Sequence, residues 1–408
     1  MDRRWQGTIL EVRKIERRRR AASAPVLHPN PDPSWRAHYL MCHHGAMETH
    51  VLIIGGGIAG LSLAWQLAPT VPVILVEAEG TLSYHTSSRS ARQMQPSYGP
   101  APIQELTHRS IALVEQISAG LSSPILIPRH LMTLGTVAEV QALVATHSSL
   151  TALDQDQTMH RSPDLRPETF EAAALDETAH EVDVPALLDF YRREAVAAGA
   201  VFLTEHPVTA VEATGAGFTV TAGGHTIEAR IVVNAAGAWA DTVAQMVGAR
   251  PRGLRPYRRS VAIVSTQFPV DPAGPMVEPA DESFYYRPDG GHLLISPCET
   301  VPAEPGDAQV VEADIAQLIQ RIDAVTTLRI TGVVRAWTGL RTQPADGLPV
   351  VGMDTEVPNF FWLAGQSGYG IQTSAALATM AAQLVTGTLP DEDSALAAAL
   401  SPQRAGLN

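Results

Sequence analysis

A short apolar run followed by closely spaced glycines constrains this chain more than any other stretch. In HVLIIGGGIAG, the β-branched run Val51–Ile54 suits a strand buried on both faces, and Ile58–Ala68 continues with helical spacing. Gly55, Gly57 and Gly60 supply the pattern GxGxxG at the junction. The first glycine permits a tight turn, the second lets the backbone approach a pyrophosphate, and the third lets helix and strand pack closely. The stretch therefore predicts a phosphate site at a helix start, where free N–H groups meet negative charge.

A second apolar strand strengthens this prediction. Val73–Val76 ends in Glu77, about 20 residues after the glycines, where an acid accepts ribose hydroxyls and would repel a 2′-phosphate. An ordinary glycine-rich turn would not predict that acid. Strand, glycines, helix, strand and acid together predict a dinucleotide-binding fold, but they leave both NAD and FAD open.

The rest of the chain favours FAD. The polar loop Ser83–Gly99 stands where an NAD enzyme would continue with alternating strands and helices. Two later segments, Arg230–Trp239 and Phe360–Ala376, again combine an apolar strand, a turn of small residues and a helix start. We therefore expect three separated segments to return to one sheet. No second GxGxxG follows a strand, so a separate NAD site is not visible.

Composition limits the alternatives. A chain of 408 residues that is 45% hydrophobic suits two interleaved domains. The net charge is −13, yet residues 1–46 carry nine Arg or Lys against four acids, so the acidic remainder argues against wrapping a nucleic acid. The basic run Arg17–Arg20 is compatible with an arm for nucleic acid or a membrane surface. We expect residues 1–46 instead to be a disordered basic extension, or a translated leader ahead of a start at Met47.

Other classes of protein are disfavoured. No apolar stretch after the basic residues resembles a secretory signal, and no window of about 18 apolar residues predicts a membrane span. Cys42 and Cys298 are the two cysteines, too few for a disulfide framework or a cysteine metal cluster, so we expect no metal site and a cytoplasmic protein. Lys14 is the one lysine, which excludes lysine chemistry from the folded body.

Six phrases taken in order resemble a known family. They are SSRSA, VNAAGAWAD, RRSVAIV, DESFYYRPDGG, WTGLRTQPADG and FFWLAGQSGYGIQTSAA. They are similar to the FAD-dependent amine and amino-acid oxidoreductases that include D-amino-acid oxidase, glycine oxidase and sarcosine oxidase. The likeness spans Met47 to about Gln403, and within the family it is strongest to the bacterial D-arginine dehydrogenase type.

The resemblance implies an α/β fold, α+β overall, with a Rossmann-like FAD-binding domain built from discontinuous segments and a substrate domain whose antiparallel sheet roofs the flavin. We expect residues 47–100, 181–250 and 345–390 in the FAD-binding domain, residues 101–180 and 251–344 in the substrate-binding domain, and residues 391–408 as a C-terminal tail.

The resemblance also implies where FAD binds. The glycine motif and its acid resemble the AMP and pyrophosphate site, the polar loop closes on the flavin, and the last helix start meets the flavin pyrimidine. Negative charge on reduced flavin is stabilised there by roughly 0.3 to 2 kcal/mol. Gly339 stands near the position of a cysteine in relatives with covalent flavin, so we expect noncovalent FAD. The implied cofactor residues are Gly55, Gly57, Ile58, Ala59, Gly60, Glu77, Ser88, Arg89, Val208, Ala236, Gly237, Gly368, Tyr369, Gly370, Ile371, Gln372 and Thr373.

Two arginines in strand-like runs are the candidate substrate clamp. A guanidinium pairs with a carboxylate in bidentate geometry, and more strongly in a dry cleft. We expect Arg259 and Arg341 to bind the α-carboxylate, with Tyr98 and Tyr285 adding hydrogen bonds. Without the resemblance, a surface or structural ion pair is the simpler interpretation of either arginine.

Neighbours and histidines are expected to play lesser parts. Because strand residues alternate, Arg258 should point to the opposite face as a solvated residue, and Tyr286 should serve packing. His85, His130 and His292 invite the role of base, but a lone histidine is more often structural, so the base stays unassigned. The fixed carboxylate lets Cα–H point at flavin N5, and the resulting imino acid hydrolyses to a 2-oxo acid and ammonia.

The side-chain pocket departs from the arginine-preferring relatives. Leu131 stands where those have an acid, Gln93 where they have histidine, and Gln95 where they have threonine. Without that acid a buried cation would lack a partner, so neutral or apolar D-amino acids are favoured. Oxidation of N-methyl amino acids or 2-hydroxy acids, and a role as a flavin-carrying subunit, stay open. The sequence does not identify the electron acceptor.

Overall fold

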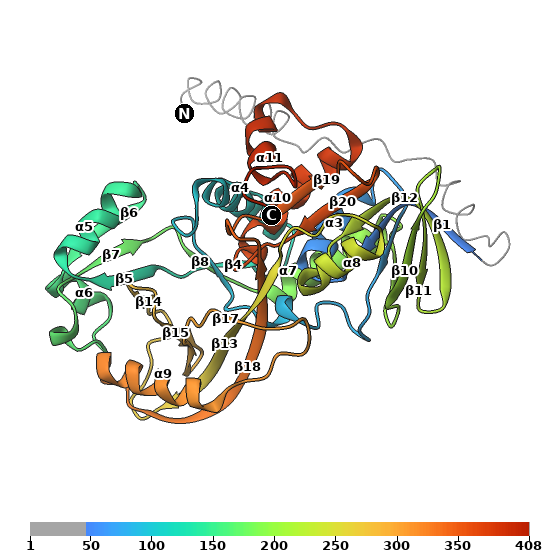
Figure 1. Ribbon diagram of the computed structural model, residues 1–408. Coiled ribbons are helices and arrows are strands. Elements are labelled where there is room, and N and C mark those ends of the chain that lie inside the picture. The colour runs from blue at the N-terminus through green and yellow to red at the C-terminus, as the bar shows by residue number, and fades with distance from the viewer. Residues whose placement is uncertain (1–45, 408) are drawn as a thin grey trace, which may run out of the picture. The chain divides into compact units, whose positions relative to one another are not determined.

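The computed structural model describes residues 46–407, so most of the expected basic extension lies outside the described residues. A parallel core sheet begins with β1 (Ala46–Ile54), which pairs with β2 (Val73–Val76) on one side and β12 (His225–Asn234) on the other. β12 then pairs with β20 (Phe360–Ala364), so the three expected segments do return to one sheet (Figure 1). The sheet is completed by β9 (Val201–Leu203), β10 (Val208–Ala213), β11 (Phe218–Ala222) and β19 (Val350–Met353).

Apolar side chains cover both faces of this sheet, as its continuous β-branched runs predict. One core joins the sheet to the helices α3 (Ile58–Leu67), α4 (Ala101–Ser118), α7 (Val184–Ala197), α10 (Gly370–Thr386) and α11 (Ser394–Leu400). The other core lies beneath α8 (Ala240–Met246). The mixed α/β fold expected from the sequence is confirmed.

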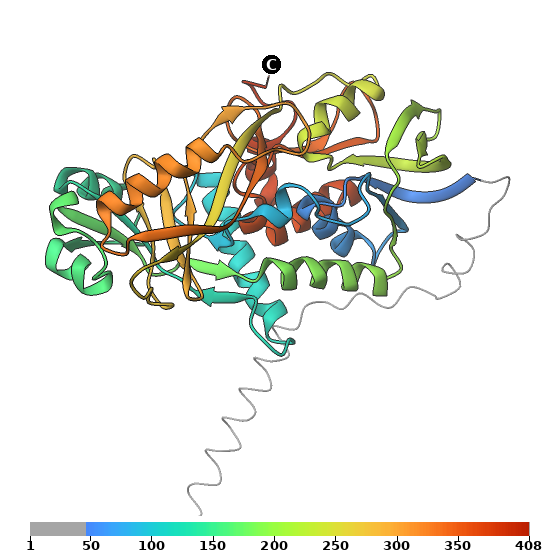
Figure 2. The ribbon, with the colours of Figure 1, turned by 90° about the horizontal axis from the view of Figure 1, so that it is seen from below.

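A second, largely antiparallel sheet forms the other half of the described chain. Its strands are β5 (Leu131–Gly135), β6 (Leu150–Asp154), β7 (Ala172–Asp176), β13 (Arg255–Thr266), β14 (Met276–Pro279), β15 (Tyr285–Asp289), β16 (His292–Ser296), β17 (Val301–Pro302) and β18 (Ile330–Gln343). Its helices are α5 (Val137–Thr146), α6 (Gln155–Arg161) and α9 (Glu312–Val325). One face packs against the apolar side of α9 (Figure 2).

A three-stranded sheet links the two halves. It consists of β3 (Gln93–Met94), β8 (His180–Val182) and β4 (Leu126–Pro128). Charged side chains reinforce this region, because Glu181 accepts from Arg129 at 2.9 Å and lies 3.1 Å from the buried guanidinium of Arg287. Arg287 also donates to the carbonyl oxygen of Ala91 at 3.1 Å, which ties the polar loop to the second sheet.

Two segments pack differently from the expected division. Helix α4 lies against α10 and places Leu106 and Val114 in the first core, although residues 101–180 were expected in the substrate-binding domain. In the expected tail, Leu400 is buried in the same core and Leu407 in the second. These apolar side chains pack in the cores on the two faces of the parallel sheet, where burial removes them from water.

The glycine turn is fixed by two close backbone approaches. Gly55 has a φ of +109°, and a Cβ there would overlap the carbonyl oxygen of Ala235 at the end of β12. A Cβ on Gly60 would overlap the carbonyl oxygen of Gly55. The expected roles of the first and third glycines therefore have a steric basis in backbone atoms that cannot move aside.

We predict that Gly60→Ala destabilises the protein, although alanine has the higher helix propensity. Overpacking of this kind costs about 1–3 kcal/mol or more. Gly215→Ala is the matched control, because a Cβ there meets nothing within 4 Å. Denaturant unfolding of the two variants measures the difference, and a Gly60→Ala protein as stable as Gly215→Ala would contradict the steric argument.

Candidate active site

Two connected voids run along the carboxyl ends of the parallel strands. One has a cavity volume of about 330 Å³ and the other about 190 Å³. Their walls share seven residues, Gly57, Thr86, Ser87, Arg89, Ala235, Gly237 and Leu340. We call them the nucleotide void, which contains Glu77 in its wall, and the substrate void, which contains Arg259. Ligand sites of open α/β sheets lie at this edge.

Glu77 lies in the wall of the nucleotide void. Its Oε2 accepts a hydrogen bond of 2.7 Å from the backbone N–H of Gly56, and its Oε1 accepts one of 2.9 Å from the backbone N–H of Glu79. These contacts fix the carboxylate, and each oxygen keeps a further lone pair for a ribose hydroxyl. Val208 and Ala236, two of the implied cofactor residues, also line this void.

The polar loop presents a different serine from the one expected. In the 3₁₀ turn Thr86–Arg89, Ser87 lines both voids and its Oγ accepts from the N–H of Ile58 at 2.9 Å. Ser88 lines neither void, because its hydroxyl turns back to the carbonyl oxygens of Tyr84 and His85. Adjacent residues of this turn therefore point in opposite directions. No pattern in the sequence predicts which of the two serines points into the voids.

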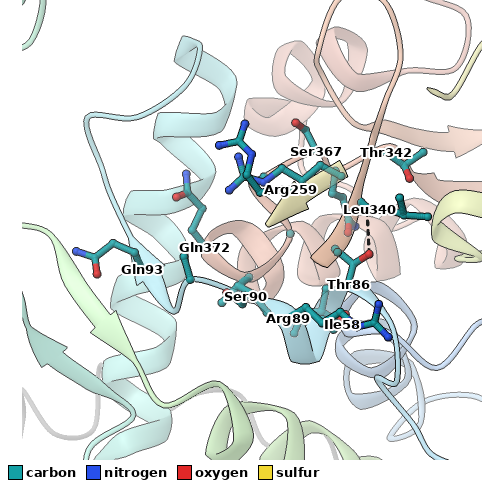
Figure 3. Close-up of a pocket in the computed structure, with 18 of the residues that line it drawn as sticks. Ile58, Thr86, Arg89, Ser90, Gln93, Arg259, Leu340, Thr342, Ser367 and Gln372 are labelled. Atoms are coloured by element: carbon teal, nitrogen blue, oxygen red, sulfur yellow. Dashed lines mark hydrogen bonds between the residues drawn. The ribbon is translucent and has the colours of Figure 1, made fainter. Parts of the chain in front are cut away.

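Arg89 and Thr86 tie this loop to the second sheet. Arg89 donates to the carbonyl oxygen of Thr338 at 2.8 Å and to Asp307 at 2.6 Å. Thr86 donates to the carbonyl oxygen of Leu340 at 2.8 Å, the contact drawn dashed in Figure 3. Gly339 lines the substrate void beside them, so no thiol is available at this position for a covalent link.

The start of α10 forms another wall of the substrate void. Gly368, Gly370, Ile371 and Gln372 line it, and the N–H groups of a first helical turn have no acceptor within the helix. Two of the expected residues in this segment, Tyr369 and Thr373, do not line the void. Tyr369 packs near Tyr98 with ring centroids 5.4 Å apart, and Thr373 is buried with its hydroxyl bonded to the Tyr369 carbonyl.

The four expected clamp residues all line the substrate void. They are Tyr98, Arg259, Tyr285 and Arg341. Among residues 46–407 no carboxylate oxygen lies within 4.0 Å of either guanidinium. The Nε of Arg259 and the hydroxyl of Tyr285 are buried without a hydrogen-bond partner in the described structure. Burial raises the pKa of Tyr285, so its hydroxyl stays protonated and available as a donor.

Strand alternation separates these residues from their neighbours as expected. Arg258 points to the opposite face, where it contacts Asp314 of α9 at 3.3 Å, so it is paired rather than simply solvated. Tyr286 is buried in the core beneath α9 and donates to Asp164 at 3.2 Å. Figure 3 shows Arg259 among side chains from distant parts of the chain that surround one space.

The side-chain pocket differs from the expected one. Gln93 and Gln95 line the substrate void, but Leu131 does not; it is buried behind the wall against Met276. Two acids that the sequence prediction did not include, Glu278 and Glu282, also line the void. Alternation along β14 was the one available signal, since Met276 and Glu278 flank the core residue Val277.

None of the three histidines lines the substrate void. His85 bonds Glu79 at 2.9 Å beside the nucleotide void, and His292 is exposed near Ser265.

Within residues 46–407, no cluster of three or more His, Cys, Asp or Glu side chains is arranged to hold a metal ion. In the same residues no helix combines the length and apolar character needed to cross a membrane.

Comparison with known proteins identifies the family. Residues 50–384 match the model of the DAO family, described as FAD dependent oxidoreductase. The chain belongs to this family. One of the subunits of opine oxidase from Rhizobium meliloti is 26% identical over 86% of the chain and 97% of that protein. Glycine oxidase of Geobacillus kaustophilus is 25% identical over 82% and 92% respectively.

Solved structures agree on the fold. The crystal structure of glycine oxidase from Geobacillus kaustophilus matches with a TM-score of 0.75 and 24% identity, over 88% of this chain and 99% of that one. L-proline dehydrogenase from P. horikoshii matches with a TM-score of 0.75 and 19% identity, over 88% and 98%. The expectation of an FAD-dependent oxidoreductase is confirmed at this level, while the likeness to the D-arginine dehydrogenase type stays an expectation.

We predict that Ser87→Ala weakens FAD binding by about tenfold. The substitution removes the hydrogen bond that holds the polar loop at the start of α3, so FAD would have to order this loop on binding, and loss of one such bond costs about 0.5–1.5 kcal/mol. Ser88→Ala is the control and should stay within about twofold of the parent protein. Titration of flavin-free protein with FAD measures both, and equal losses in the two variants would contradict the assigned facing of the turn.

Proposed function

We propose that this protein is an FAD-dependent dehydrogenase or oxidase of D-amino acids, which oxidises the Cα–N bond to an imino acid. The observation that carries the proposal is the pair of arginines, Arg259 and Arg341, that face the substrate void without a carboxylate partner in the described chain. A free amino acid supplies the missing carboxylate. The resemblance of the sequence motifs supports the D configuration.

The nucleotide void fits the AMP half of FAD. Gly55 and Gly57 leave backbone space for a pyrophosphate, and the fixed carboxylate of Glu77 offers acceptors for ribose. The start of α10 would stabilise negative charge at the pyrimidine end of the flavin. Gly339 supports noncovalent attachment because it offers no nucleophile. Bound there, FAD supplies the hydride acceptor that the protein side chains lack.

The side chains orient the substrate rather than react with it. Arg259 and Arg341 hold the carboxylate, and Tyr285 donates a hydrogen bond to it from a buried hydroxyl. This fixes the direction of Cα–H and removes much of the entropy cost of the reaction. The neutral amine lone pair forms the C=N bond as hydride leaves, and water then hydrolyses the released imino acid to a 2-oxo acid and ammonia.

A second candidate is a role as one component of a larger oxidase. The likeness to a protein named as a subunit of opine oxidase favours it, and the same clamp would serve a secondary amine that carries a carboxylate. The open clamp speaks against a carrier that performs no chemistry. Activity of the purified chain alone distinguishes a complete enzyme from a component that needs other chains.

Anaerobic mixing with candidate substrates tests the proposal. The panel contains D- and L-amino acids, N-methylglycine and 2-hydroxy acids, and loss of the oxidised flavin absorbance reports reduction. Reduction by D-amino acids, and not by their L enantiomers, is the expected result. No reduction by any carboxylate-bearing amine would refute it. Peroxide measured after air is admitted separates an oxidase from a dehydrogenase.

We predict that Arg341→Met raises the KM for the amino acid by about 100-fold or more. Loss of one partner from a desolvated charge pair costs about 2–5 kcal/mol. Arg258→Met is the matched control, because Arg258 lies on the opposite face of the same sheet against Asp314. Its KM should stay within about twofold. Comparable increases in both variants would mean that the clamp assignment is wrong.

A further inference from the structure

The substrate void has acidic side chains as well as the arginine clamp. Glu278 of β14 and Glu282 of the following turn line it together with the clamp. Met276 and Glu278 share one face of β14, and Val277 between them is buried in the core beneath α9. Glu278 is half-buried, and its accessible part faces the void.

Strand register separates Glu278 from the clamp. Val277 of β14 pairs with Tyr286 of β15, so Glu278 lies beside Tyr285. Tyr285 pairs with Ser296 of β16. Ser296 in turn lies beside Val261 of β13. Arg259 is two residues further along β13. Three strand steps of about 4.8 Å put the β14 backbone roughly 14 Å from the β13 backbone. Both side chains project from the same face of the sheet.

Glu278 lacks a cationic partner. Its carboxyl accepts a 3.4 Å hydrogen bond from the hydroxyl of Thr133, and no Lys, Arg or His nitrogen within residues 46–407 lies within 4.0 Å. Burial and the negative charge of Glu282 raise the pKa of Glu278 to about 8, against the lowering effect of Thr133. A half-buried acid with its pKa raised in this way is neutral unless a cation lies beside it.

The separation fits the far end of a substrate rather than its α-amine. The α-amine lies about 2.5 Å from the carboxylate carbon and therefore stays close to the arginines. An extended chain of six bonds between a carboxylate carbon and a terminal nitrogen spans roughly 7.5 Å. One hydrogen-bond contact of about 3 Å at each end brings the total to roughly 13 Å. With the two-residue offset along β13, the Cα atoms of Glu278 and Arg259 lie roughly 16 Å apart, a gap that the two long side chains shorten by reaching toward each other.

We propose that Glu278, with Glu282 at the rim, binds a cationic group at the end of the substrate side chain, so the preferred substrate is a basic amino acid. This inference rests on the proposed amino-acid oxidation and replaces the expectation of a neutral or apolar side chain. Arginines without anions and glutamates without cations, lining one void, complement a molecule that carries a carboxylate and a distant cation.

Binding of the cation is linked to ionisation of Glu278. Below about pH 8 the carboxyl of the empty void is mostly protonated, and a cation binds the ionised form, so the preference for a cation strengthens as the pH rises through 8. Besides Glu278, the titratable side chains that line the void are Arg89, Tyr98, Arg259, Glu282, Tyr285, Cys298 and Arg341. Burial raises the pKa of the Tyr285 hydroxyl above its ordinary value and that of the Cys298 thiol to about 11, so neither ionises in this range.

Two carboxylates that cannot be oxidised at Cα test the inference on the FAD-loaded protein. The probes are 6-aminohexanoate and hexanoate, which differ in the terminal ammonium, and calorimetry gives each Kd. The parent protein should bind 6-aminohexanoate at least tenfold more tightly at pH 8.5, and less selectively at pH 6.5. Glu278→Gln should lose most of this preference at both pH values and keep its Kd for hexanoate within about threefold.

Glu312→Gln, on the exposed first turn of α9 at the far face of the sheet, is the matched control and should keep the preference. Equal affinity of the parent protein for the two probes, or a preference that survives in Glu278→Gln, would overturn the inference. Flavin reduction by D-lysine and D-leucine is measured in parallel. Selective binding without reduction by any amino acid contradicts the proposed function, whereas reduction without selectivity contradicts the role of Glu278.

Discussion

The close approach of two backbone turns determines where this protein can bind a ligand. The carbonyl oxygen of Ala235 lies where a side chain of residue 55 would be, so β1 and β12 can end side by side only with glycine at that position. This contact puts the carboxyl ends of β1, β2 and β12 at one edge of the sheet. Glu77, Ala236 and Gly57, which precedes α3, reach the same void because the adjoining strands end there together.

In the second sheet, strand alternation divides structural from functional side chains. Along β13, Arg258 faces α9 whereas Arg259 faces the substrate void. Along β15, Tyr286 enters the core and Tyr285 the void in the same way. The apolar contacts that hold α9 against the sheet therefore also fix the direction of the clamp. A shift of one residue in register would bury the arginines and expose the core.

Local patterns in the sequence predict much of the fold and of the cofactor site. The buried strands, the helix after the glycines and the acid at Glu77 follow from hydrophobic period and spacing, and the structure contains them. The sequence could not predict that Ser87, rather than Ser88, points into the voids, because a 3₁₀ turn has no residue pattern that distinguishes its buried side. Glu278 was missed because β14 pairs in parallel with β5, about 145 residues earlier, and no local pattern records that pairing.

The substrate void differs from its surroundings in how its charges are paired. Arg129 and Arg287 both contact Glu181, so their charge is balanced within the protein. Arg259 and Arg341 have no such partner in residues 46–407, and neither has Glu278. Each of these groups therefore gains from a ligand that supplies the opposite charge. Because these arginines and this glutamate lie on different strands of one sheet, their spacing favours, under the proposed function, a ligand long enough to meet both.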